Sequence, residues 1–81
     1  MHAETSSPLT LEEHRELAAE IRSASARLEQ LSALVVRVYG PNNQAAFSFQ
    51  KVTEAVERLR HDMQAQADRD LPGFPVEDLY R

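Results

Sequence analysis

The sequence contains no cysteine and no tryptophan, and it has only two glycines. Without cysteine the chain forms no disulfide and offers no thiolate ligand to a metal ion. Gly40 and Gly73 are too far apart to form a glycine-rich loop that binds phosphate. The prolines are confined to positions outside the two long periodic segments, at Pro8, Pro41, Pro72 and Pro75. The fold must therefore come from the packing of regular segments.

Long apolar runs and an excess of basic charge are also missing. No run approaches the roughly 20 apolar residues that cross a bilayer, and the first residues lack the basic start and apolar stretch of a secretion signal. The formal net charge is -4, whereas non-specific binding to nucleic acid depends on basic residues that release counterions. We expect a cytoplasmic protein with neither nucleic acid nor membrane as a partner. Eight arginines against one lysine indicate a GC-rich, bacterial genome.

The short chain makes assembly attractive. A domain of 81 residues hides only about 60% of the surface that its unfolded chain exposes. Small domains are usually reinforced by disulfides, a metal or oligomerisation, and the first of these is excluded. The hydrophobic fraction of 42% and the scarcity of glycine are typical of an all-α protein. We therefore expect a helical homo-oligomer.

The first periodic segment predicts a helix over residues 11–39. Residues 1–9 have no period and are expected to form a disordered leader. Thr10 and Glu13 have the spacing of a capping box, which starts a helix at Leu11. Apolar residues then follow in steps of three and four, as in a coiled-coil seam, at Leu17, Ile21, Ala24, Leu28, Leu31, Val35 and Val38, with His14 as the polar exception. Gly40 and Pro41 end the helix, and we expect Gly40 to have a positive φ.

The second periodic segment predicts a helix over about residues 43–70. Asn42 and Asn43 are both good N-caps, and the connection is so short that the second helix must return antiparallel to the first. Its predicted seam consists of Ala45, Phe49, Val52, Val56, Leu59 and Met63. Residues 10–70 thus form a two-helix hairpin. Since the apolar rhythm weakens at Gln66 and Asp70, we expect the tightest packing near the connection.

Apolar residues outside this seam predict self-association. Leu34, Val36, Tyr39 and Phe47 lie off the seam positions and are the predicted oligomer interface. Small residues such as Ala18 and Ser25 further widen the apolar stripe of the first helix. Two hairpins can cover such stripes by forming a four-helix bundle.

Residues 71–81 form a C-terminal tail with two interpretations. The prolines at 72 and 75 exclude regular helix at its start. In one interpretation Phe74, Leu79 and Tyr80 are anchors of a motif that docks to a partner. In the other, Phe74 and Tyr80 fold back over the open end of the hairpin, where a thin core needs apolar cover. We favour the second.

The sequence offers little that carries chemistry. Glu57 and His61 lie four residues apart, a spacing that is also common in surface pairs, and Arg58 occupies the position where a Glu-x-x-His motif of a di-iron bundle needs glutamate. His14 is expected to be a satisfied, partly buried histidine beside Asp70 or the tail. We predict no catalytic residues, no metal site and no cofactor.

These observations predict a structural or adaptor module that self-associates and engages other proteins. Two alternatives stay open. One is a small bundle that binds a ligand or a metal ion, and the other is a regulatory inhibitor of a partner protein.

Overall fold

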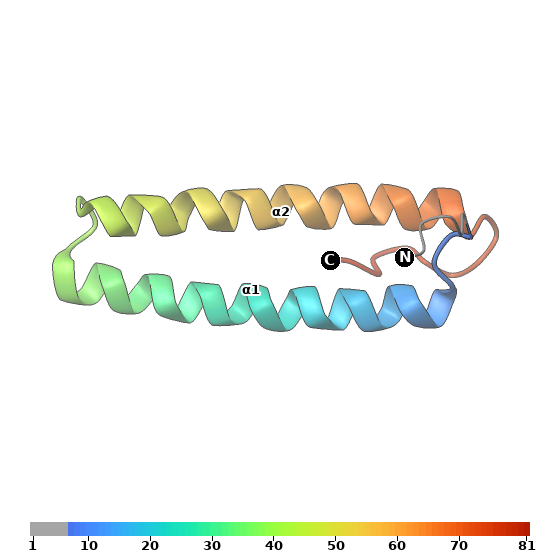
Figure 1. Ribbon diagram of the computed structural model, residues 1–81, viewed down its shortest axis with the longest axis horizontal. Helices are drawn as coiled ribbons and strands as arrows, with labels where there is room; N and C mark the ends of the chain where they lie inside the picture. Colours follow the sequence, from blue (N-terminus) through green and yellow to red (C-terminus); the bar gives the residue numbers. More distant parts are fainter. Residues whose placement is uncertain (1–6) are drawn as a thin grey trace.

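The computed structural model describes residues 7–81, which form two antiparallel helices and a C-terminal tail (Figure 1). Helix α1 spans Leu11–Tyr39 and helix α2 spans Gln44–Asp70, with no strand among the described residues. The predicted all-α hairpin is confirmed. The predicted leader over residues 1–9 lies mostly outside the described residues, and its last three residues are exposed.

Helix α1 begins at the predicted capping box. The backbone amide of Glu13 donates to Oγ1 of Thr10 at 3.1 Å, and the amide of Thr10 donates to Oε1 of Glu13 at 2.9 Å. These two bonds satisfy amides that have no partner inside the helix. The start of α1 is therefore encoded locally.

The connection between the helices depends on Gly40 and Asn43. Gly40 has φ 90° and ψ 161°, and its amide donates to the carbonyl of Val36 at 2.7 Å. The predicted positive φ is confirmed, but ψ places the residue in a region that is essentially restricted to glycine rather than in the left-handed helical region. Asn43 accepts hydrogen bonds from the amides of Ala45 and Ala46 at 2.8 and 3.4 Å and so caps α2.

The helices pack on a seam displaced from the predicted one. His14, Ala18 and Ser25 of α1 and Ala46 and Ala67 of α2 are buried. By contrast Val38, Val52 and Leu59, which were predicted to face the other helix, are 60%, 44% and 45% exposed. Small side chains allow two helices to approach closely. The helices therefore pack through the alanine-rich edge of each apolar stripe, and the larger side chains of the stripe stay outside the contact. The prediction for those three residues is wrong.

The core lies at the open end of the hairpin, not near the connection. Residues 71–81 turn back there and run between the two helices (Figure 1). Val76 and Tyr80 of this tail are buried against Ala18 and Ala67. Partly buried residues around this cluster are Leu11, Leu17, Ile21, Met63, Leu71 and Leu79. The expected tightest packing near the connection is wrong, because the tail supplies apolar cover only at the other end.

The molecule is thin and long. Its extents are 46 × 29 × 16 Å and its radius of gyration is 16.0 Å, whereas a compact domain of this length has a radius of about 12 Å. Compact domains pack two or three layers of secondary structure around one core, but this hairpin is a single helical layer with a partial second layer from the tail. Neither α1 nor α2 is long and apolar enough to cross a membrane.

Candidate functional site

A buried hydrogen-bond network joins both helices to the tail. Nε2 of His14 lies 2.9 Å from Oδ2 of Asp70, and Nδ1 of His14 lies 2.7 Å from the hydroxyl of Tyr80. His14 is fully buried and Tyr80 is 2% exposed, and their rings meet edge to face with centroids 5.8 Å apart. The predicted satisfied histidine beside Asp70 and the tail is confirmed, and its burial is complete.

The protons of this network are fixed by the carboxylate. The hydrogen bond from His14 lowers the pKa of Asp70, and so does the bond from Gln66. An ionised carboxylate only accepts hydrogen bonds, so Nε2 of His14 carries a proton and donates to it. In a neutral imidazole Nδ1 then accepts from the Tyr80 hydroxyl, which satisfies all three groups. Burial raises the pKa of Tyr80, and the nearby charge of Asp70 raises it further.

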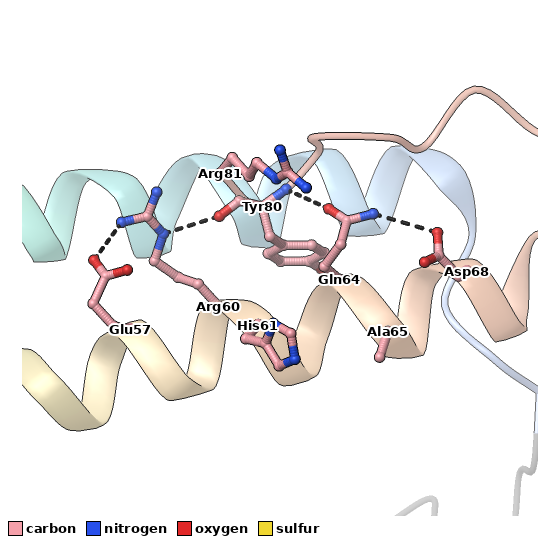
Figure 2. Close-up of a pocket in the computed structure, with 8 residues that line it drawn as sticks. All are labelled: Glu57, Arg60, His61, Gln64, Ala65, Asp68, Tyr80 and Arg81. Atoms are coloured by element: carbon pink, nitrogen blue, oxygen red, sulfur yellow. Dashed lines mark hydrogen bonds and ion pairs between the residues drawn. The ribbon is translucent and has the colours of Figure 1, made fainter.

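The backbone of the tail is held by side chains of the helices. Figure 2 shows Nε of Arg60 donating to the carbonyl of Tyr80 at 2.9 Å, and the amide of Tyr80 donating to Oε1 of Gln64 at 3.0 Å. Nε2 of Gln64 also donates to the carbonyl of Val76 at 2.7 Å. From the other helix, Nη1 of Arg22 reaches the carbonyl of Leu79 at 3.5 Å. Side chains of α1 and α2 thus replace the partners that the irregular tail backbone lacks.

A surface cavity of about 570 Å³ lies beside Tyr80 and Arg81 on the outer side of α2 (Figure 2). Its polar lining is largely occupied by other contacts. Arg60 binds the tail and also pairs with Glu57 at 2.9 Å, while Gln64 binds the tail and lies 3.4 Å from Asp68. This cavity therefore belongs to the attachment of the tail.

One side of the hairpin is apolar and uncovered, and we call it the open face. It consists of Leu17, Ala24, Leu31 and Val38 of α1 and Ala45, Val52, Leu59 and Gln66 of α2. None of these residues is buried. Each one directly precedes a residue of the stripe that contains Ala18 and Ser25 on α1, or Ala46 and Ala67 on α2.

The open face lies opposite the tail. Consecutive helical residues are rotated by about 100°, so the open face and the tail-side stripe flank the seam from opposite sides. Two antiparallel helices are related by a two-fold axis perpendicular to the plane that contains them both. This axis places equivalent stripes of α1 and α2 on the same side of the hairpin. The tail contacts Ala18 and Ala67 on its own side. Of the open face only Leu17 packs against this cluster, and the rest of the face is left bare.

The predicted oligomer interface is exposed but divided between two sides. Leu34, Val36, Tyr39 and Phe47 are 44%, 37%, 68% and 51% exposed. Leu34 is three residues from Leu31 and extends the open face. Val36, Tyr39 and Phe47 lie on the side of the tail, nearer the connection. They lie two helical turns from Glu29, Ser32 and Glu54, respectively, which are on that side. The structure thus does not gather the four residues into one patch.

The tail anchors differ in burial. Tyr80 is inside the molecule, Leu79 is partly buried, and Phe74 is 51% exposed. Phe74 does not seal the open end over Leu11 and Leu71 as expected. Val76 takes this role, and the sequence pattern does not predict it because valine is a smaller apolar anchor than the neighbouring aromatic residues. The segment between Val76 and Tyr80 is not helical, and Asp78 has a φ of 64°, so no periodicity in the sequence indicates that Val76 is buried.

The residues considered for metal binding do not come together. Glu57 pairs with Arg60 rather than with His61, and His14 is occupied by Asp70 and Tyr80. Within residues 7–81 no group of three histidine, aspartate or glutamate side chains has the geometry to hold a metal ion.

Comparison of the chain with protein-family models, with curated proteins and with solved structures gives no match. The arguments for function therefore come from the surfaces of the hairpin itself.

Proposed function

We propose that the protein is a self-associating interaction module and that a second copy covers the open face to form a four-helix bundle. The observation that carries this proposal is the division of the hairpin into two unlike sides. Its own tail covers one side at the open end, whereas leucine and valine side chains of the other side remain in water. Such contiguous apolar surfaces on a soluble helical domain are typical of protein interfaces.

The size of the open face suits a stable dimer. A helix of 29 residues is about 43 Å long, and two helices side by side are about 20 Å wide. The face therefore offers about 800 Å² for each copy, which is the usual contribution of one partner to a specific complex. Pairing two such faces gives the second layer that the thin hairpin lacks.

Charged residues border the open face. Glu20 and Arg27 flank it along α1, and Asp62 and Arg69 flank it along α2. An apolar centre with a charged rim of both signs is the usual composition of a helical interface, since the rim fixes register while the centre loses water. A second copy carries the same acidic and basic residues along its own open face, so its charges can pair with those of this rim.

A matched pair of substitutions tests the proposal. Val52→Glu places a charge in the open face, while Val36→Glu places the same charge on the opposite side at a similar exposure of 37% against 44%. Burying an unpaired carboxylate in an interface costs several kcal/mol. We expect a dimeric mass by light scattering for the wild type and for Val36→Glu, and a monomeric mass for Val52→Glu.

Three results would overturn the proposal. They are a monomeric wild type at micromolar concentration with a cooperative melt, a dimer that Val52→Glu leaves intact, and a dimer that only Val36→Glu dissociates. The last result would move the interface to the side of the tail. Circular dichroism on both variants shows that the hairpin itself remains folded.

A further inference from the structure

A groove continues from the tail towards the connection, on the side opposite the open face. Its volume is about 420 Å³, and we call it the acidic groove. It is lined by Ser25, Glu29, Ser32 and Ala33 of α1 and by Thr53, Glu54 and Glu57 of α2. The tail fills the part of this side near the open end, and the acidic groove is the part that it leaves free.

The carboxylates of the groove come from both helices and are unequally neutralised. Glu57 pairs with Arg60 at 2.9 Å, and Glu54 lies 4.0 Å from Lys51. For Glu29 no cation lies within salt-bridge distance anywhere in residues 7–81. Glu29 therefore leaves an unpaired negative charge on the α1 wall of the groove, and the α2 wall facing it carries the carboxylates of Glu54 and Glu57.

A buried hydroxyl at the floor of the groove is a second observation that points to a ligand. Ser25 is 8% exposed and lines the groove, and its hydroxyl has no hydrogen-bond partner among residues 7–81. A buried hydroxyl without a partner costs free energy. An ammonium or guanidinium group between the two walls would donate to this oxygen and to the carboxylates.

An apolar patch adjoins the groove at the end nearer the connection. Val36, Tyr39 and Phe47 lie two helical turns from Glu29, Ser32 and Glu54, respectively, on the same stripes. Lys51 already places its ammonium 5.1 Å from the centre of the Phe47 ring, a cation-π geometry. The surface thus combines acidic walls with an exposed aromatic and aliphatic neighbour.

We propose that the acidic groove binds a basic peptide segment of a partner protein. A lysine or arginine of the segment pairs with Glu29 and Glu54 above Ser25, and an adjacent apolar side chain packs on Val36, Tyr39 and Phe47. The net charge of -4 attracts such a segment at long range. Because the groove lies opposite the open face, a dimer would present two such sites, one on each outer side.

Fluorescence anisotropy with a defined probe tests this site on the full chain. The probe is a fluorescein-labelled peptide of alternating lysine and alanine with one phenylalanine, and its counterpart has glutamate in place of lysine. We expect the lysine peptide alone to bind, more weakly as salt rises. The double variant Glu29→Gln/Glu54→Gln should lose about tenfold in affinity, since it removes two exposed ion pairs that each strengthen binding by about threefold. Phe47→Ala should also weaken binding.

The matched control is Glu12→Gln/Glu16→Gln, which removes the same charge from exposed positions of α1 that neither line the groove nor border the open face. It should bind the lysine peptide nearly as well as the wild type. Equal losses in the two double variants would show unspecific attraction and overturn the proposal, as would equal binding of the glutamate peptide or no binding at low salt. The mass of Glu29→Gln/Glu54→Gln in light scattering reports separately on the open face, so the two proposals fail independently.

Discussion

Replacing Tyr80 by phenylalanine removes a single oxygen atom from the buried network at the open end. The ring of Tyr80 packs with Ala18, Ala67 and Val76, and phenylalanine preserves this packing and the edge-to-face contact with His14. The hydroxyl, however, is the partner of Nδ1 of His14 at 2.7 Å. Since His14 is 0% exposed, no water reaches that nitrogen in its place.

The expected loss follows from this isolation. A buried polar atom that loses its partner costs about 1 to 3 kcal/mol. For a domain of this size each kcal/mol lowers the melting temperature by about 4 to 8 °C. Tyr80→Ala, which also removes the ring and opens a cavity, should lose about 3 to 5 kcal/mol.

Urea denaturation followed by circular dichroism measures these changes, at a fixed protein concentration because the proposed association would contribute to stability. Tyr39→Phe is the control, since Tyr39 is 68% exposed and its hydroxyl should contribute less than about 0.5 kcal/mol. If Tyr80→Phe and Tyr39→Phe unfold at the same urea concentration as the wild type, the tail does not occupy the buried position and the network does not exist in solution. Faster amide exchange of residues 76–81 in Tyr80→Phe would locate the loss in the tail.

Three further predictions concern pH and the connection. The pKa of Asp70 is lowered in the folded protein, so its stabilisation is complete above the ordinary value of about 3.8 and is lost as pH falls through the lower folded value. The urea midpoint should therefore fall at acid pH, and Asp70→Asn should flatten this fall. The pKa of Tyr80 is raised, so its stabilisation is present below about pH 10 and is lost above it, and Tyr80→Phe should remove that alkaline limb. Gly40→Ala should destabilise by about 1 to 3 kcal/mol, because the added Cβ meets no atom within 4 Å and only the positive φ opposes it; an unchanged melting temperature would mean that the connection adopts another conformation.

The sequence alone determined the features that depend on neighbours along the chain. The capping box at Thr10, the end of α1 at Gly40 and the N-cap near Asn43 each involve residues within four positions of one another, so their hydrogen bonds are readable as spacing. The three-four rhythm of apolar residues indicated two helices, and the short connection required them to be antiparallel. His14 was assigned to Asp70 or the tail because it was the polar exception at the open end.

Only the tertiary structure decided which edge of the apolar stripe closes the hairpin. Ala45 and Ala46, or Val52 and Thr53, satisfy the same periodicity in two registers rotated by one residue, and periodicity cannot choose between them. The choice depends on side-chain volume in three dimensions and on the tail, which inserts Tyr80 between the helices and satisfies His14. That contact joins residues 66 positions apart. It turns one side of the hairpin inward and leaves Val52 and Leu59 on the open face, which is why the proposed interface follows from the structure and not from the sequence pattern.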